Sequence, residues 1–174
     1  PSTIQFAEKA TKMIFENLEV VYNDGKNIEA RNQMLLASYN AGMAFTRAYV
    51  GYVHAIAHNL GGFYGLPHGL ANAVILPVML ESYGSAVYGS LSRLADLVGI
   101  KGANEEEKAK AFIAEIYAMN ERMGIPKGFA QIQEKDIPII VERALKEGNP
   151  LYPVPVIYGE AEMTAIVKSL MIKE

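Results

Sequence analysis

Residues 51–77 read GYVHAIAHNLGGFYGLPHGLANAVILP, and this stretch holds all three histidines of the 174-residue chain. His54 and His58 are four residues apart, a spacing that places both imidazoles on the same face of an α-helix. The glycines Gly61 and Gly62 allow the chain to reverse, so that His68, at the start of a following helix, can return toward the first two. We therefore predict two consecutive helices that meet at a histidine cluster.

Apolar residues recur at helical spacing along nearly the whole chain, and no stretch keeps the alternation of a β-strand. Asn104 suits an N-cap and Gly124 a helix end, whereas Gly42 and Gly51 weaken the long second helix and predict a break or kink there. The predicted helices cover about residues 5–20, 27–58, 85–98, 104–123, 138–146 and 160–171, with a further helix starting at Pro67. We predict a single all-α domain over residues 1–174.

Composition excludes several classes of protein. The net charge is −3 and cysteine is absent, which gives no basic patch for nucleic acid, no disulfide scaffold and no thiolate zinc site. The most apolar stretch, Leu70–Leu80, is too short to cross a bilayer and contains Pro77. We expect a cytoplasmic protein with neither nucleic acid nor membrane as a partner.

Histidine spacing alone predicts a metal site with His54, His58 and His68 as three ligands, because imidazole binds iron, zinc, copper and nickel. The alternative interpretation is that these are hydrogen-bonded packing residues, which is the common role of a histidine on an apolar helix. No carboxylate lies between the histidines in the sequence, so the HExxH pattern of a metalloprotease is excluded.

The run from Gly51 to Pro77 closely resembles the signature of the iron-containing alcohol dehydrogenase family, whose several fixed spacings are far more specific than a histidine pair. The similarity extends over nearly the whole chain, from residues 40–45 before the signature to Asn149 and Pro150 near the end. It implies the multi-helix C-terminal domain of the dehydroquinate synthase-like, iron alcohol dehydrogenase fold, without the N-terminal α/β domain.

The same resemblance implies roles for individual residues. His54 and His68 match the metal ligands, Fe²⁺ in this branch with Zn²⁺ as the other possibility. His58 matches a catalytic pocket residue near the nicotinamide and the substrate, which corrects the three-ligand interpretation. Phe45 matches an aromatic residue that packs at the nicotinamide, although a core position is the other interpretation of its sequence context.

Parts of the family site are absent from this chain. The family's metal takes an Asp and a His from an earlier helix, and NAD or NADP binds the N-terminal domain; here no Asp precedes Asp24 and no His precedes His54. Because the first residue is Pro1 rather than methionine, we expect a longer protein. We predict an oxidoreductase that interconverts an alcohol with its aldehyde or ketone, and we expect the chain alone to bind metal weakly and to be inactive.

Two alternatives stay open at this point. One is a free-standing helical metal-binding or interaction module without catalysis, which full metal occupancy by the three histidines together would favour. The other is a zinc-dependent relative similar to glycerol dehydrogenase. An apolar surface left by an absent partner domain tends to associate, so we expect a homo-oligomer.

Overall fold

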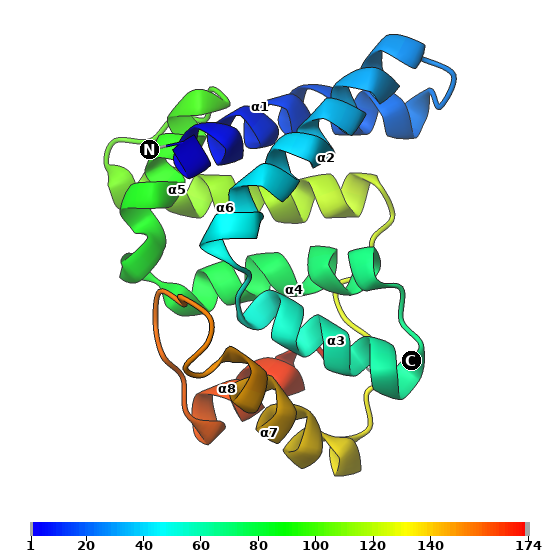
Figure 1. Cartoon of the computed structure of the whole chain (residues 1–174), viewed down its shortest axis with the longest axis vertical. Helices are drawn as coiled ribbons and strands as arrows, with labels where there is room; N and C mark the ends of the chain where they lie inside the picture. Colours follow the sequence, from blue (N-terminus) through cyan, green and yellow to red (C-terminus); the bar gives the residue numbers. More distant parts are fainter. Residues whose placement is uncertain (1, 173–174) are drawn as a thin grey trace. The chain divides into compact units, whose positions relative to one another are not determined.

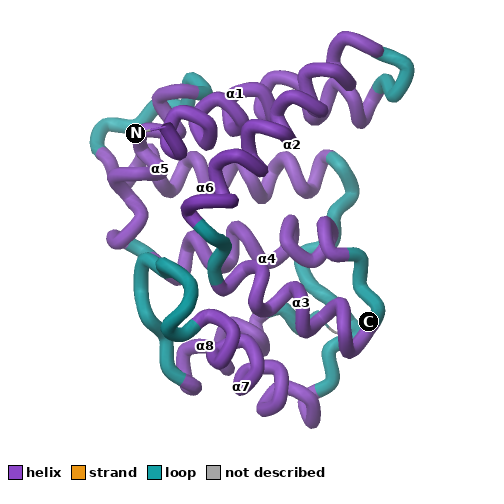
Figure 2. The backbone as a smooth tube through the Cα atoms, in the orientation of Figure 1, coloured by secondary structure: helices purple, strands orange, loops and turns teal. Residues whose placement is uncertain are grey.

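A computed structural model describes residues 2–172, except for the side chain of residue 2 (Figure 1). Within this range the chain is helical without a single β-strand, as Figure 2 makes plain, so the predicted all-α class is confirmed. None of these helices combines the length and apolar character needed to cross a bilayer. The elements are α1 (Ser2–Asn23), α2 (Ile28–Ala48), α3 (Tyr52–Tyr64), α4 (His68–Tyr83), α5 (Ser85–Leu97), α6 (Glu105–Arg122), the 3-10 turn η1 (Glu134–Asp136), α7 (Ile137–Gly148) and α8 (Glu160–Ser169).

The chain divides into two compact units. One contains the residues up to Tyr49 together with Tyr88–Phe112, and the other contains Val50–Val87 and the chain from Ile113 onward. All three histidines lie in the second unit, whereas Phe45 lies in the first. That residues 1–174 form a single domain therefore stays a prediction.

The first unit is built on the antiparallel hairpin of α1 and α2 (Figure 1). Asn27 caps α2 by accepting a hydrogen bond from the Ala30 N–H at 3.0 Å, as expected for a helix that begins near this residue. The two helices pack against each other, and the buried side chains that they carry are mostly small, among them Ala10, Ala30, Ala37 and Ala44.

The second unit has an apolar core supplied mainly by α3, α4, α7 and α8. Pairs of these helices pack against one another, α3 on α4 and on α7, and α7 on α8. The side chains that are almost completely buried there include Tyr52, Ile56, Leu60, Ile75, Met79, Ile137, Ile140, Val141, Met163, Val167 and Leu170. This core fixes the faces of α3 and α4 that carry the histidines.

The structure corrects the position of one turn. Gly61 and Gly62 were expected to end the helix that carries His54, but both lie inside α3. The helix ends instead at Gly65, whose φ of 66° is the left-handed conformation that glycine adopts at no steric cost. The predicted break in the second long helix is confirmed at Gly51, the N-cap residue of α3, whereas Gly42 lies within α2 without interrupting it.

Pro77 lies within α4 and is fully buried, so its effect on the helix has to be compensated. A proline has no N–H, and the carbonyl of Ala73, four residues earlier, therefore lacks its usual helical donor. The side-chain amide of Asn120 on α6 donates to that carbonyl at 2.8 Å. The hydrogen bond satisfies the orphaned carbonyl and joins α6 to α4 within the second unit.

We predict that Asn120→Ala lowers the free energy of unfolding by about 1–3 kcal/mol, because it leaves the Ala73 carbonyl without a partner. Urea denaturation followed by circular dichroism measures the change. The matched control is Glu121→Ala, at the next position of the same helix and exposed, which should stay within about 0.5 kcal/mol of the parent chain. Equal effects of the two substitutions would contradict this role of Asn120.

Candidate functional site

The three histidines come from two helices and gather at one place. His54 and His58 lie one turn apart on α3, and His68 is the first residue of α4, returned to α3 by the turn at Gly65. The ring centroids are separated by 5.9 Å between His54 and His58 and by 5.3 Å from each of them to His68. The predicted meeting of the three rings is therefore a feature of the fold.

The orientations of the three rings differ. The rings of His54 and His68 are tilted by 54° to each other, and those of His58 and His68 are nearly parallel, at 14°. Within residues 2–172 no group of three or more His, Cys, Asp or Glu side chains is arranged to hold one metal ion. The cluster therefore offers imidazole ligands, but the described residues do not complete a metal site by themselves.

Burial and mutual repulsion act on the protonation of His54. This ring is half-buried, whereas His58 and His68 are exposed. Burial lowers the pKa of His54 below its ordinary value, the nearby imidazoles of His68 and His58 lower it further, and Glu147 acts in the opposite direction. This shift favours the uncharged form of His54, which is the form in which imidazole binds a metal.

Asn72, one turn after His68, supports that ring. Its side-chain nitrogen lies 2.9 Å from the His68 carbonyl oxygen, to which it donates, and 3.1 Å from Nε2 of the ring. Its Oδ1 atom is buried and accepts no hydrogen bond from residues 2–172. A buried acceptor without a partner is costly.

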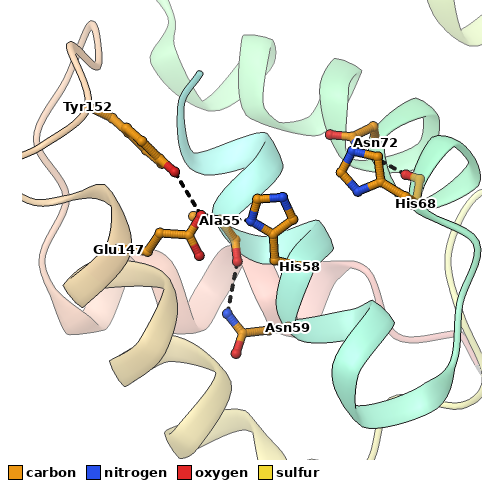
Figure 3. A network of polar contacts seen from close by, with 7 residues as sticks. All are labelled: Ala55, His58, Asn59, His68, Asn72, Glu147 and Tyr152. Atoms are coloured by element: carbon orange, nitrogen blue, oxygen red, sulfur yellow. Dashed lines mark hydrogen bonds and ion pairs between the residues drawn. The ribbon is translucent and has the colours of Figure 1, made fainter. Parts of the chain in front are cut away.

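A carboxylate that the sequence analysis did not foresee joins the site from a distant part of the chain. Glu147, in the last turn of α7, brings Oε1 to 2.7 Å from Nδ1 of His58 (Figure 3). The hydroxyl of Tyr152 donates to the same Oε1 at 2.9 Å. Burial raises the pKa of Tyr152, and the hydrogen bond and charge of Glu147 raise it further, so this hydroxyl keeps its proton.

The sequence carried only a partial signal for Glu147. The buried face of α7 includes Ala144 and Gly148, and Glu147 stands at the edge of that face, where a carboxylate needs a polar partner. Nothing local identifies that partner, because His58 lies 89 residues earlier. Tyrosines nearer in sequence to the histidines bond elsewhere: the Tyr52 hydroxyl donates to Asn149 Oδ1.

The contact of Gly148 with Tyr52 sets how closely α7 approaches α3. A Cβ atom at Gly148 would lie 2.5 Å from Cε1 and 2.7 Å from Cδ1 of the Tyr52 ring, distances at which atoms overlap. Tyr52 is completely buried and cannot withdraw. Glycine at this position therefore allows the end of α7 to approach the helix that carries His58.

Comparison with known proteins adds an independent finding. A sequence model of the C-terminal part of the Fe-containing alcohol dehydrogenase family matches residues 1–171. Alcohol dehydrogenase 4 of Saccharomyces cerevisiae is 38% identical over 170 residues, which cover 97% of this chain and 44% of the yeast protein. The 1,3-propanediol dehydrogenase of Klebsiella pneumoniae is 39% identical over 172 residues, which cover 97% of this chain and 44% of that protein.

Solved structures give the same result. The crystal structure of a 1,3-propanediol oxidoreductase superimposes with a TM-score of 0.92 at 38% identity, covering 98% of this chain and 46% of that one. Alcohol dehydrogenase from Oenococcus oeni superimposes with a TM-score of 0.91 at 32% identity, covering 98% and 45%. The chain thus spans less than half the length of the relatives that it matches.

We predict that Gly148→Ala destabilises the chain by about 1–3 kcal/mol, because the added methyl group overlaps the Tyr52 ring. Gly62→Ala, inside α3 with open space around the added Cβ, is the matched control and should stabilise by up to about 1 kcal/mol. Chemical denaturation measures both changes. A Gly148→Ala chain at least as stable as the parent would refute the close contact.

Proposed function

This chain belongs to the Fe-containing alcohol dehydrogenase family, as its C-terminal helical part, and on that premise we propose that it supplies half of the metal site of an NAD(P)-dependent alcohol dehydrogenase. The reaction is the interconversion of an alcohol and its aldehyde or ketone. The observation that carries the proposal is the gathering of His54, His58 and His68 with ring centroids 5.3–5.9 Å apart.

His54 and His68 are the proposed metal ligands. Metal–nitrogen bonds of about 2.0–2.1 Å put the ring centroids of two imidazoles on one tetrahedral ion about 5 Å apart, close to the 5.3 Å between these two rings. The lowered pKa of His54, which favours the uncharged form, suits a bound cation, and the buried Oδ1 of Asn72 beside His68 has no hydrogen-bond partner within residues 2–172. When bound, Fe²⁺ or Zn²⁺ supplies Lewis acidity that polarises the oxygen of the alcohol or carbonyl group.

Two imidazoles are too few for a tight site, since catalytic metal sites usually have three protein ligands. We propose that the remaining ligands belong to a preceding part of a longer protein, as does the surface that binds NAD or NADP. This chain then supplies one side of the active site and holds its ligands on two packed helices. Because α3 and α4 are rigid helices, they keep the angle between His54 and His68 constant, so that the remaining ligands can complete the site around them.

His58 and Phe45 are the proposed residues on the cofactor side. His58 is exposed and, being hydrogen-bonded to Glu147, presents its other ring nitrogen to the site. Phe45 on α2 is about half exposed, at 51%, which suits an aromatic ring that packs against a nicotinamide better than a core role. A cytoplasmic location and assembly into a homo-oligomer are further parts of the proposal, the latter supported by the exposed apolar side chains of α2, which include Ile28, Leu35 and Tyr39.

We predict that the isolated chain binds Zn²⁺ weakly and that His54→Ala and His68→Ala each lower the affinity by about 10–100-fold or more, because each removes a ligand. His58→Ala should leave the affinity within about threefold of the parent, a difference well below one ligand's contribution. Isothermal titration calorimetry at neutral pH measures all four proteins.

The same titration distinguishes the alternatives. Tight binding that is lost equally in His54→Ala, His58→Ala and His68→Ala would favour a free-standing three-histidine metal module and would overturn the half-site. Circular dichroism of each variant checks that a loss of affinity comes from the ligand rather than from unfolding.

We also predict that the isolated chain with Fe²⁺ or Zn²⁺, NAD or NADP and primary or secondary alcohols forms no reduced cofactor above background, because the proposal assigns most of the cofactor-binding surface to a preceding part of a longer protein. Absorbance of the reduced nicotinamide measures the rate. A rate above background that His54→Ala abolishes would sink the proposal that the chain is half of a site. An immunoblot of the source cells then gives the size of the native protein, for which the proposal requires about twice the 19.0 kDa of this chain.

A further inference from the structure

We propose that Glu147 and Tyr152 are positioning residues that hold His58 in one tautomer, with the proton on Nδ1 and with Nε2 free to accept a hydrogen bond from a hydroxyl group bound at the histidine cluster. The three side chains form a short chain of hydrogen bonds that reaches from α3 through the end of α7 to the following loop (Figure 3). Only the identity of the hydroxyl group, that of the alcohol substrate, rests on the proposed function.

The tautomer follows from the chemistry of the partner. A carboxylate has no proton to donate and can only accept, so the 2.7 Å contact with Glu147 Oε1 requires the proton on Nδ1 of His58. In the uncharged ring the other nitrogen, Nε2, then carries a lone pair. No side chain within residues 2–172 bonds to it. The His58 side chain is 45% exposed, which leaves Nε2 accessible to a bound molecule.

The carboxylate is in turn held by its surroundings. The Tyr152 hydroxyl donates to Oε1 at 2.9 Å, and the backbone of Tyr152 is tied to α7 by its N–H, which donates to the Gly148 carbonyl at 2.9 Å. Tyr152 and His58 therefore converge on one oxygen atom, from a loop and from a helix. Such a shared acceptor restricts the rotation of Glu147 and, through it, that of the imidazole.

The loop that carries Tyr152 is anchored to the histidine helix as well. The Tyr52 hydroxyl, at the start of α3, donates to Asn149 Oδ1 at 2.6 Å and accepts from the Tyr158 N–H at 3.1 Å. Both ends of the loop are thereby bound to a single buried side chain of α3. The positions of Glu147 and Tyr152 relative to His58 follow from this attachment, which supports a positioning role over a chance surface ion pair.

A histidine held in one tautomer can accept a hydrogen bond from one fixed direction. In water an imidazole exchanges its proton between the two nitrogens, and a ligand has to select one form. A carboxylate on Nδ1 removes that choice and orients the lone pair of Nε2, the arrangement by which an acidic residue orients a histidine in many active sites. The acceptor at Nε2 favours a ligand with a hydroxyl group over one with a carbonyl oxygen at this point.

Nitrogen NMR of the chain labelled with ¹⁵N-histidine tests the proposal directly, because three histidines give a spectrum that single substitutions can assign. We expect His58 of the parent chain to be mainly in the Nδ1–H tautomer. Glu147→Ala should shift it toward the Nε2–H form that free imidazole prefers, and Glu147→Gln should give both forms, because an amide can donate as well as accept. Glu142→Ala, on the same helix and exposed, is the matched control and should change nothing.

Tyr152→Phe provides a second reading. Without the Tyr152 hydroxyl, Glu147 is held less firmly, so the fraction of His58 in the Nδ1–H tautomer should fall, whereas Tyr39→Phe at an exposed position should leave it unchanged. The proposal is overturned if the parent chain has His58 in the Nε2–H form, or if both Glu147 variants keep the Nδ1–H form while circular dichroism reports a folded chain. These spectra need neither metal nor cofactor, so they can fail while the zinc titration succeeds, and the reverse.

Discussion

The contact between the buried ring of Tyr52 and the bare backbone of Gly148 is the constraint on which the second unit depends. It brings the end of α7 against the beginning of α3 with no side chain between them. From that contact the hydroxyl of Tyr52 reaches Asn149 Oδ1 and the N–H of Tyr158, so the loop after α7 is bound to the helix that carries the histidines. Packing between α3 and α7 therefore fixes the backbone around the site. The positions of the polar side chains His58, Glu147 and Tyr152 follow from that packing.

The histidine cluster combines two opposing electrostatic requirements. Burial lowers the pKa of His54, and the imidazoles of His68 and His58, whose ring centroids lie 5.3 and 5.9 Å away, lower it further. Glu147 opposes the trend from the other side, where it bonds the exposed His58. The two sides of the cluster therefore differ: burial favours the uncharged form of His54, whereas a carboxylate bonds the ring of His58. This difference agrees with the different roles proposed for His54 and His68 on one hand and His58 on the other.

Membership of the Fe-containing alcohol dehydrogenase family and the small share of the relatives' length that the chain covers have to be considered together. The chain matches less than half of each of these relatives, and its two histidine-bearing helices are what it contributes to the half-site that we propose. The free energy that maintains the site comes from the apolar core of the second unit, and the hydrogen bond from Asn120 to Ala73 repairs the defect that Pro77 introduces in α4. His54 on α3 and His68 on α4, the ligands that we propose, are accordingly held in place by the core of the second unit.

The sequence by itself determined what depends on neighbouring residues. Helical periodicity gave the all-α class, Asn104 was recognisable as a cap and accepts from the Glu107 N–H at 2.9 Å, and the spacing of His54 and His58 placed both on one face. The sequence misplaced the turn before His68. A glycine within a helix, such as Gly61, and a glycine that ends one, such as Gly65, look alike in a sequence and differ only in their backbone φ angle. Only the tertiary structure decided the partner of His58. Glu147 and Tyr152 lie about ninety residues away along the chain and meet it through packing at Tyr52 and Gly148, and no local pattern encodes a contact made by the folding of the whole unit.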